Sequence, residues 1–172
     1  MAYLPQVIEL MTAHIDGVDE FDEELAKAQN ERFLSTFQDA ISAEVKPFLA
    51  DNWYYSNPPF TVNNILIIPI RGAIMPQDYC GCAGTSTIMS WYEKAKQDSS
   101  ITGVLEIADS GGGAVFGTPE LANYKVNYPK PVLTLVEGLC CSAMEFIALG
   151  SDQIWATSEV CICGSIGVMT SF

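Results

Sequence analysis

The sequence is short of histidine, of positive charge and of long apolar runs, and each shortage excludes a class of function. The one histidine, His14, lies ahead of the strand-rich part of the chain, so that part has no histidine to serve as a base. Lys and Arg number 8 against 21 Asp and Glu, and the net charge of −13 leaves no basic cluster for the phosphates of a nucleic acid. No stretch approaches the roughly 20 apolar residues that span a bilayer, and the N-terminus lacks the pattern of a secretion signal. We therefore expect a soluble, cytoplasmic protein with no nucleic-acid partner and no membrane segment.

Residues 1–60 differ from the rest of the chain in charge and in periodicity. Eleven of the 21 acidic residues lie there. Apolar residues recur at steps of three and four between Phe33 and Leu49, which predicts an amphipathic helix. Its apolar face packs either on its own domain or on another subunit or partner protein. We predict an acidic helical extension and linker over 1–60, followed over 61–172 by one domain that is long enough to bury its own core.

Six cysteines stand in three close pairs, which raises the question of a metal site or disulfides. Their spacings, Cys-x-Cys and Cys-Cys, are not those of zinc knuckles, and a cytosolic compartment keeps thiols reduced. We therefore predict no metal. Four of them are expected to be small core residues: Cys140, Cys141, Cys161 and Cys163. Cys80 and Cys82 lie in a predicted loop, where redox or metal chemistry stays open.

A candidate nucleophile turn lies within 136–146, where an apolar strand turns through Gly138 and small residues into a helix that begins at Ser142. A serine at a helix start sits beside unpaired backbone N–H groups and the positive end of the helix dipole, which would stabilise an oxyanion. The alternative is an ordinary capping box, because Glu145 stands three residues after Ser142.

A second motif, Asp109-Ser110-Gly111-Gly112-Gly113, follows the apolar strand 103–108. Successive glycines let a substrate or an oxyanion approach main-chain N–H groups, although a flexible strand-to-helix loop would look the same. Asp-Ser-Gly-Gly also surrounds the nucleophile of chymotrypsin-like proteases. That interpretation of Ser110 is disfavoured, because it needs an all-β double barrel and a base histidine.

The two motifs, in this order, resemble the signal peptide peptidase A family of serine peptidases, which shares the fold of the Clp protease proteolytic subunit and of crotonases. The Gly-Ser-Ile-Gly stretch at 164–167 and the segment 151–156 match the same family, and 67–85 resembles its phage and prophage branch, which includes head-maturation proteases. The resemblance covers roughly residues 62–172. It implies a cofactor-free peptidase that cleaves polypeptides and assembles into homo-oligomers.

By this resemblance Ser142 is the nucleophile, the backbone N–H groups of Gly113 and Ala143 form the oxyanion hole, and Gly111 and Gly112 pair with a substrate strand. The family's base is a lysine downstream of the Gly-Ser-Ile-Gly stretch, so we expect it outside this chain and expect the chain as given to be inactive. The lysines present are interpreted as solvated surface charges: Lys27, Lys46, Lys94, Lys96, Lys125 and Lys130. The alternative is a base within the chain, for which Lys125 and Lys130, near the motif helices, are the candidates.

Three departures from the family pattern carry expectations of their own. Gly111 replaces the usual proline. Glu145, one turn after the serine, is expected to cap the helix, although it could also orient a lysine. Glu106, in a strand that the family keeps apolar, is expected to face solvent or a neighbouring subunit.

The predicted fold is α/β: a Clp/crotonase-like spiral of βαβ units with an N-terminal helical extension. The expected strands are 65–70, 103–108, 131–136, 153–156 and 160–168, and the expected helices are 86–97, 118–127 and 142–150. The predicted function is a serine endopeptidase with a Ser-Lys dyad, acting on phage capsid or scaffold proteins or on cleaved signal peptides, in the host cytoplasm or the phage prohead. The alternatives are an inactive structural or capsid-associated member and a crotonase-like acyl-CoA enzyme, for which Glu137 and Glu145 could be acid and base.

Overall fold

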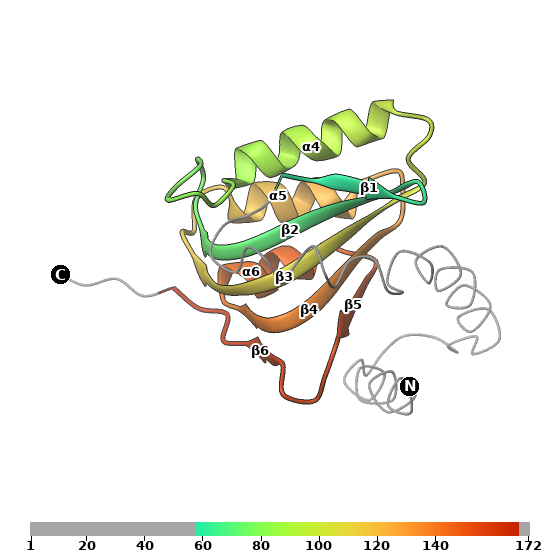
Figure 1. Ribbon diagram of the computed structural model, residues 1–172. Coiled ribbons are helices and arrows are strands. Elements are labelled where there is room, and N and C mark those ends of the chain that lie inside the picture. Colours follow the sequence, from blue (N-terminus) through green and yellow to red (C-terminus); the bar gives the residue numbers. More distant parts are fainter. Residues whose placement is uncertain (1–57, 169–172) are drawn as a thin grey trace, which may run out of the picture. The chain divides into compact units, whose positions relative to one another are not determined.

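The computed structural model describes residues 58–168, which form a layered α/β unit (Figure 1). Six strands make one sheet in the order β1-β2-β3-β4-β5, with β6 paired to β4. Their bounds are β1 Phe60–Val62, β2 Ile65–Ile74, β3 Gly103–Gly113, β4 Val132–Cys141, β5 Gln153–Ala156 and β6 Ile162–Gly164. Only β1 among these strands runs antiparallel to its neighbour. The predicted α/β class with parallel strands and helices between them is confirmed.

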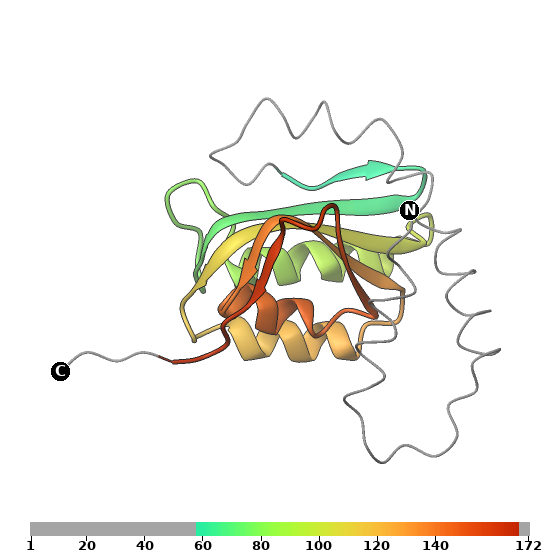
Figure 2. The same ribbon diagram turned by 90° about the horizontal axis from the view of Figure 1, so that it is seen from below.

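Three helices connect the parallel strands: α4 Thr85–Gln97, α5 Thr118–Val126 and α6 Ala143–Ala148. All three lie on the same side of the sheet, as the view from below makes clear (Figure 2). Strands β2, β3 and β4 are almost continuously apolar, which is typical of parallel strands that are buried on both faces. Because successive side chains of a strand point to opposite faces of the sheet, each of these strands places apolar side chains on both faces.

The core between sheet and helices is built from apolar side chains of β2, β3 and β4 packed on all three helices. Ile88 and Tyr92 of α4, Leu121 of α5 and Ile147 of α6 are each 1% exposed or less. Burying side chains of this size contributes roughly 1.5–3 kcal/mol each. The core thus fixes where the helices lie against the ends of β3 and β4.

Three strands extend beyond their predicted ends, and β2 continues to Ile74 instead of ending at residue 70. The strand predicted over 160–168 is confined to β6, Ile162–Gly164. β3 continues through the three glycines, because Ile74 of β2 pairs with Gly113. β4 continues to Cys141, because Leu139 to Cys141 pair with β6. The sequence had suggested that the chain turns at Gly138, but the turn into α6 is made at Ser142. The predicted extension over 1–60 falls almost entirely outside the described residues, and the division at residue 60 stays a prediction.

Candidate active site

Ser142 lies at a sharp turn between β4 and α6. Its backbone has φ 54° and ψ −117°, a conformation that L-residues rarely adopt. Such strain persists only where the surroundings enforce it, and it is typical of a serine presented on a strand-to-helix turn. Here the Ser142 N–H donates to the carbonyl of Gly164 (2.8 Å), and the Ser142 carbonyl accepts from the N–H of Phe146 (3.0 Å). The Gly-Ser-Ile-Gly stretch and the serine turn, distant in sequence, thus meet in space.

The capping-box alternative does not describe this turn. Ser142 makes no side-chain cap hydrogen bond, and its backbone is far from the extended conformation of an N-cap residue. The Glu145 carboxylate instead lies close to the thiol of Cys140, and its Oε2 is buried without a hydrogen-bond partner. Burial is the main cause that raises the pKa of this thiol, and the contact with Glu145 adds to it. The expectation that Glu145 caps the helix is therefore wrong.

The glycine segment lies directly against the serine turn. Gly112 has φ +101°, and a Cβ built on it would lie 2.7 Å from both Ser142 Cβ and Cys141 O and 3.0 Å from the Ala143 nitrogen. A Cβ on Gly113 would overlap the backbone of Ile74, whereas one on Gly111 would meet nothing within 4 Å. Gly112 therefore allows β3 to approach the N-terminus of α6 as closely as it does.

Two polar side chains hold the glycine segment in place. The Ser110 hydroxyl donates to Gly72 O (2.6 Å) and accepts from the Gly112 N–H (3.1 Å). The Asp109 carboxylate accepts from the Leu139 N–H (3.0 Å), which ties the end of β3 to β4 just before the serine turn. Ser110 is 1% exposed, so it is a structural anchor here and not a presented nucleophile.

One lysine is not where the sequence suggested. Lys125 is 3% exposed, and its Nζ donates to Glu106 Oε2 (2.5 Å) and to the carbonyl of Ile147 (2.9 Å). Burial lowers the pKa of Lys125, although the Glu106 charge opposes this. Its two recorded acceptors lie away from the start of α6, so this amine is not directed at Ser142. Lys130 donates to Ala95 O and Asp98 O, at the end of α4.

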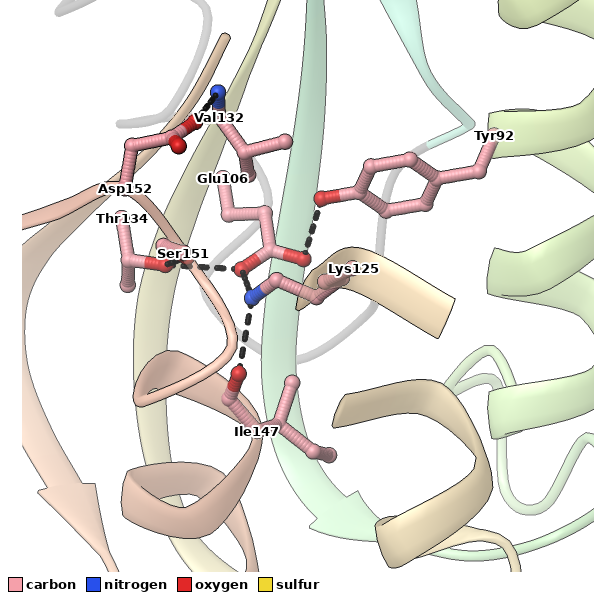
Figure 3. A network of polar contacts seen from close by, with 8 residues as sticks. All are labelled: Tyr92, Glu106, Lys125, Val132, Thr134, Ile147, Ser151 and Asp152. Atoms are coloured by element: carbon pink, nitrogen blue, oxygen red, sulfur yellow. Dashed lines mark hydrogen bonds and ion pairs between the residues drawn. The ribbon is translucent and has the colours of Figure 1, made fainter. Parts of the chain in front are cut away.

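Glu106 is the centre of a buried polar network (Figure 3). It is fully buried on the helix side of β3, which overturns the expectation that it faces solvent or another subunit. Its Oε1 accepts from the Tyr92 hydroxyl (2.7 Å), and its Oε2 accepts from the Thr134 hydroxyl (2.8 Å) as well as from Lys125. Burial and this carboxylate together hold the pKa of Tyr92 well above its usual range. This network was not predicted from the sequence, although Lys125 falls in helical step with the buried Leu121.

Two carboxylates kept a crotonase-like reaction open, and they differ in their contacts. Glu137 Oε2 accepts from Arg71 Nη2 (2.7 Å). Glu145 Oε2 is buried without a hydrogen-bond partner. A carboxylate that serves as acid or base must reach the reacting proton, and the contact with Arg71 holds Glu137 elsewhere.

The cysteines are free thiols, and of the four that were expected in the core only one is fully buried. Cys140 is buried and Cys141 and Cys161 are half-buried, but Cys163 on β6 is exposed. Cys82 of the 80–82 loop is buried, beside Gly72. Within residues 58–168 no three His, Cys, Asp or Glu side chains are grouped as a metal site would require. No helix in this part of the chain has the length and apolar character to cross a membrane.

Comparison with known proteins gives relatives by sequence and by fold. No family model matches the chain. It is 32% identical over 117 residues to the head-tail preconnector protein GP5 of Enterobacteria phage P21, covering 64% of this chain and 23% of that protein. It is 34% identical over 82 residues to an Enterococcus faecium protein named as signal peptide peptidase SppA, covering 46% of this chain and 24% of that protein. The chain thus spans about a quarter of the length of these curated relatives.

Solved structures add a likeness of fold. An enoyl-CoA hydratase from Polaromonas sp. JS666 matches with a TM-score of 0.51 and 18% identity, over 60% of this chain and 48% of that one. At this identity the match concerns the architecture of sheet and helices, and it does not extend to the reaction.

Proposed function

Because the chain belongs to the signal peptide peptidase A-like protease family, with relatives in phages, we propose that it is a serine peptidase with Ser142 as its nucleophile. The observation that carries the proposal is the strained turn at Ser142, set directly against Gly112. An ordinary helix start needs neither the φ of 54° nor a glycine at this contact. A nucleophile that must project from the end of a strand needs both.

In the proposed reaction, the Ser142 hydroxyl attacks the carbonyl carbon of a peptide bond while a neutral base takes its proton. The negative charge that forms on the carbonyl oxygen is stabilised by the backbone N–H groups of Gly113 and Ala143. The intermediate then collapses: the C–N bond breaks, the base returns its proton to the leaving amine, and the acyl group remains on Ser142. Water, deprotonated by the same base, hydrolyses this ester and restores the serine.

The base is proposed to be a lysine other than those that the structure describes. An ordinary lysine has a pKa of about 10.4, so a working base must be desolvated enough to be neutral near pH 7. Lys125 is buried, but its amine is held by Glu106 and Ile147. The described lysines therefore leave the proton acceptor to another segment or subunit, and a homo-oligomer is part of the proposal.

The substrate is proposed to be a polypeptide that binds in extended form along Gly111 and Gly112. The phage relative favours a capsid or scaffold protein within a prohead in the host cytoplasm, and the other relative favours cleaved signal peptides. The competing proposal is an inactive, capsid-associated member of the family. This second proposal is favoured because the amine of Lys125 is held by Glu106 and by the Ile147 carbonyl, which leaves it unable to serve as the base.

The test is covalent labelling by a fluorophosphonate, with the adduct located by mass spectrometry. It is run on this chain and on the product of the uninterrupted reading frame, each beside its Ser142→Ala variant and a Ser90→Ala control. Ser90 is exposed on α4, so its loss should leave labelling unchanged. Labelling at Ser142 that disappears only in Ser142→Ala supports the peptidase. No labelling of either product rejects it and favours the inactive member.

A further inference from the structure

The buried network around Glu106 connects the two halves of the candidate site. Glu106 lies on β3, the strand that ends in the glycine segment, and Lys125 on α5 bridges it to α6, the helix that begins at Ser142 (Figure 3). The side chains of Lys125 and Glu106 are both 0% exposed. Thr134 of β4 bonds to the same carboxylate oxygen as Lys125 and also to Ser151, just after α6.

The bond from Lys125 to Ile147 holds the far end of α6. This helix has 6 residues, too few to hold its place through its own hydrogen bonds. Its last carbonyl groups lack partners within the helix and carry the negative end of the dipole. The Ile147 carbonyl already accepts from the Gly150 N–H (3.1 Å), and the buried ammonium group of Lys125 donates a second hydrogen bond to it. The position of this end of α6 determines how far the Ser142 end advances toward Gly112.

We propose that Lys125 and Glu106 are positioning residues, which set α6 against β3 and thereby place the Ser142 hydroxyl relative to the backbone N–H groups of Gly113 and Ala143. The inference rests on the proposed function, because the geometry it controls is that of the nucleophile and the oxyanion site. Neither side chain touches the reacting atoms.

Chemistry gives a reason for an ion pair at this place. Two apolar side chains of similar volume would often stabilise the fold as well as a buried ion pair does. They would not fix the distance between β3 and α6 to the length of hydrogen bonds, because apolar contacts are non-directional. A displacement of about 1 Å at a catalytic group can cost about 10²-fold in rate.

The main test removes both charges at once with the double variant Lys125→Met and Glu106→Gln. Gln can still pair with Tyr92 and Thr134, and Met has nearly the volume of Lys, so no unpaired charge is left in the core. The matched control is Lys96→Met with Glu93→Gln, which removes an exposed ion pair on α4. Glu106→Asp is the second variant: it keeps both charges, shortens the reach by one methylene, and replaces the double variant if that does not fold.

Two quantities are measured on the form of the protein that is labelled at Ser142. The first is the rate constant of fluorophosphonate labelling at saturating probe, separated from the apparent binding constant of the probe. The second is the set of backbone amide NMR signals of Gly112, Gly113 and Ala143. We expect the rate constant to fall about 10²-fold with binding unchanged, and these amide signals to move more than in the control variant.

The outcomes separate this inference from the proposed function. If the double variant and Glu106→Asp label at the wild-type rate and their amide signals do not move, the positioning role is wrong while the peptidase stands. If the wild-type protein is not labelled at all, the peptidase is wrong. The amide signals then decide alone: movement supports a role in placing α6 against β3, and no movement overturns it.

Discussion

Replacing Gly112 with alanine should disable Ser142 more than it destabilises the fold. The new Cβ would lie 2.7 Å from Ser142 Cβ, whereas carbon atoms in contact are normally separated by about 3.5–4.0 Å. The two residues must therefore move apart by about 1 Å. A displacement of this size at a nucleophile costs about 10²-fold in rate, so the labelling of Ser142 is expected to slow by about that factor.

The same substitution has a calculable cost in stability. At φ +101° an L-residue is unfavourable by about 1–2 kcal/mol relative to glycine. For a chain of this length, 1 kcal/mol corresponds to about 2–4 °C in Tm. Gly112→Ala should therefore lower Tm by several degrees and still leave a folded protein at 25 °C, where the labelling rate can be measured.

Gly117→Ala is the matched control. Gly117, at the start of α5, also has a positive φ, of +86°, and a Cβ there would overlap the side chain of Thr85, the first residue of α4. It should lose a similar amount of stability and keep its labelling rate. Gly111→Ala, with open space around its Cβ, should keep its Tm. If Gly112→Ala loses stability but labels like the wild-type protein, then the close approach of Gly112 to Ser142 does not serve the nucleophile, and the reasoning fails.

The strain at Ser142 predicts that Ser142→Gly is more stable than Ser142→Ala by about 1–2 kcal/mol in urea unfolding, and equal stabilities would contradict that strain. Lys125→Met alone, which leaves the Glu106 charge buried and unpaired, should cost about 3–5 kcal/mol, and adding Glu106→Gln should recover part of this. Burial, followed by the Glu93 charge, raises the pKa of Tyr128 to about 12. The folded chain therefore holds more protons than the unfolded chain between pH 10 and 12, so this contribution to stability is complete below pH 10 and is lost as the pH rises through 12. Urea unfolding across that range should show a shallower fall for Tyr128→Phe, and an unchanged slope would count against the shifted phenol.

The alternation of strands and helices could be predicted because it depends on local apolar pattern. The runs in β2, β3 and β4 and the helical steps of α4 and α5 lie close to where the sequence placed them. The ends of β3 and β4 could not be predicted, because they depend on pairing with distant segments. Gly113 joins β3 only through Ile74, and Cys141 joins β4 only through Gly164. The short strand β1 depends likewise on β2.

The candidate site, like the fold, could be predicted only in part from the sequence. The motif order places Ser142 and the glycine segment in one region, and the structure brings Gly112 and Gly164 to the serine turn. Lys125 was assigned to the surface with the other lysines, because they lie among polar neighbours or at turns, and for Lys125 that assignment was wrong. Its burial follows from the partner on β3, and the pairing of one acid in an apolar strand with one lysine on a buried helical face was the available signal.

Several independent contacts explain how the rare backbone conformation at Ser142 persists. The N–H of Ser142 is held by Gly164, its carbonyl by Phe146, and its Cβ faces Gly112, so the residue is fixed from three directions. Each contact comes from a different segment of the chain, and the strain of about 1–3 kcal/mol is offset by all of them together. Relief of the strain therefore requires that one of these segments move. Under the proposed function, this arrangement would place the Ser142 backbone before substrate arrives.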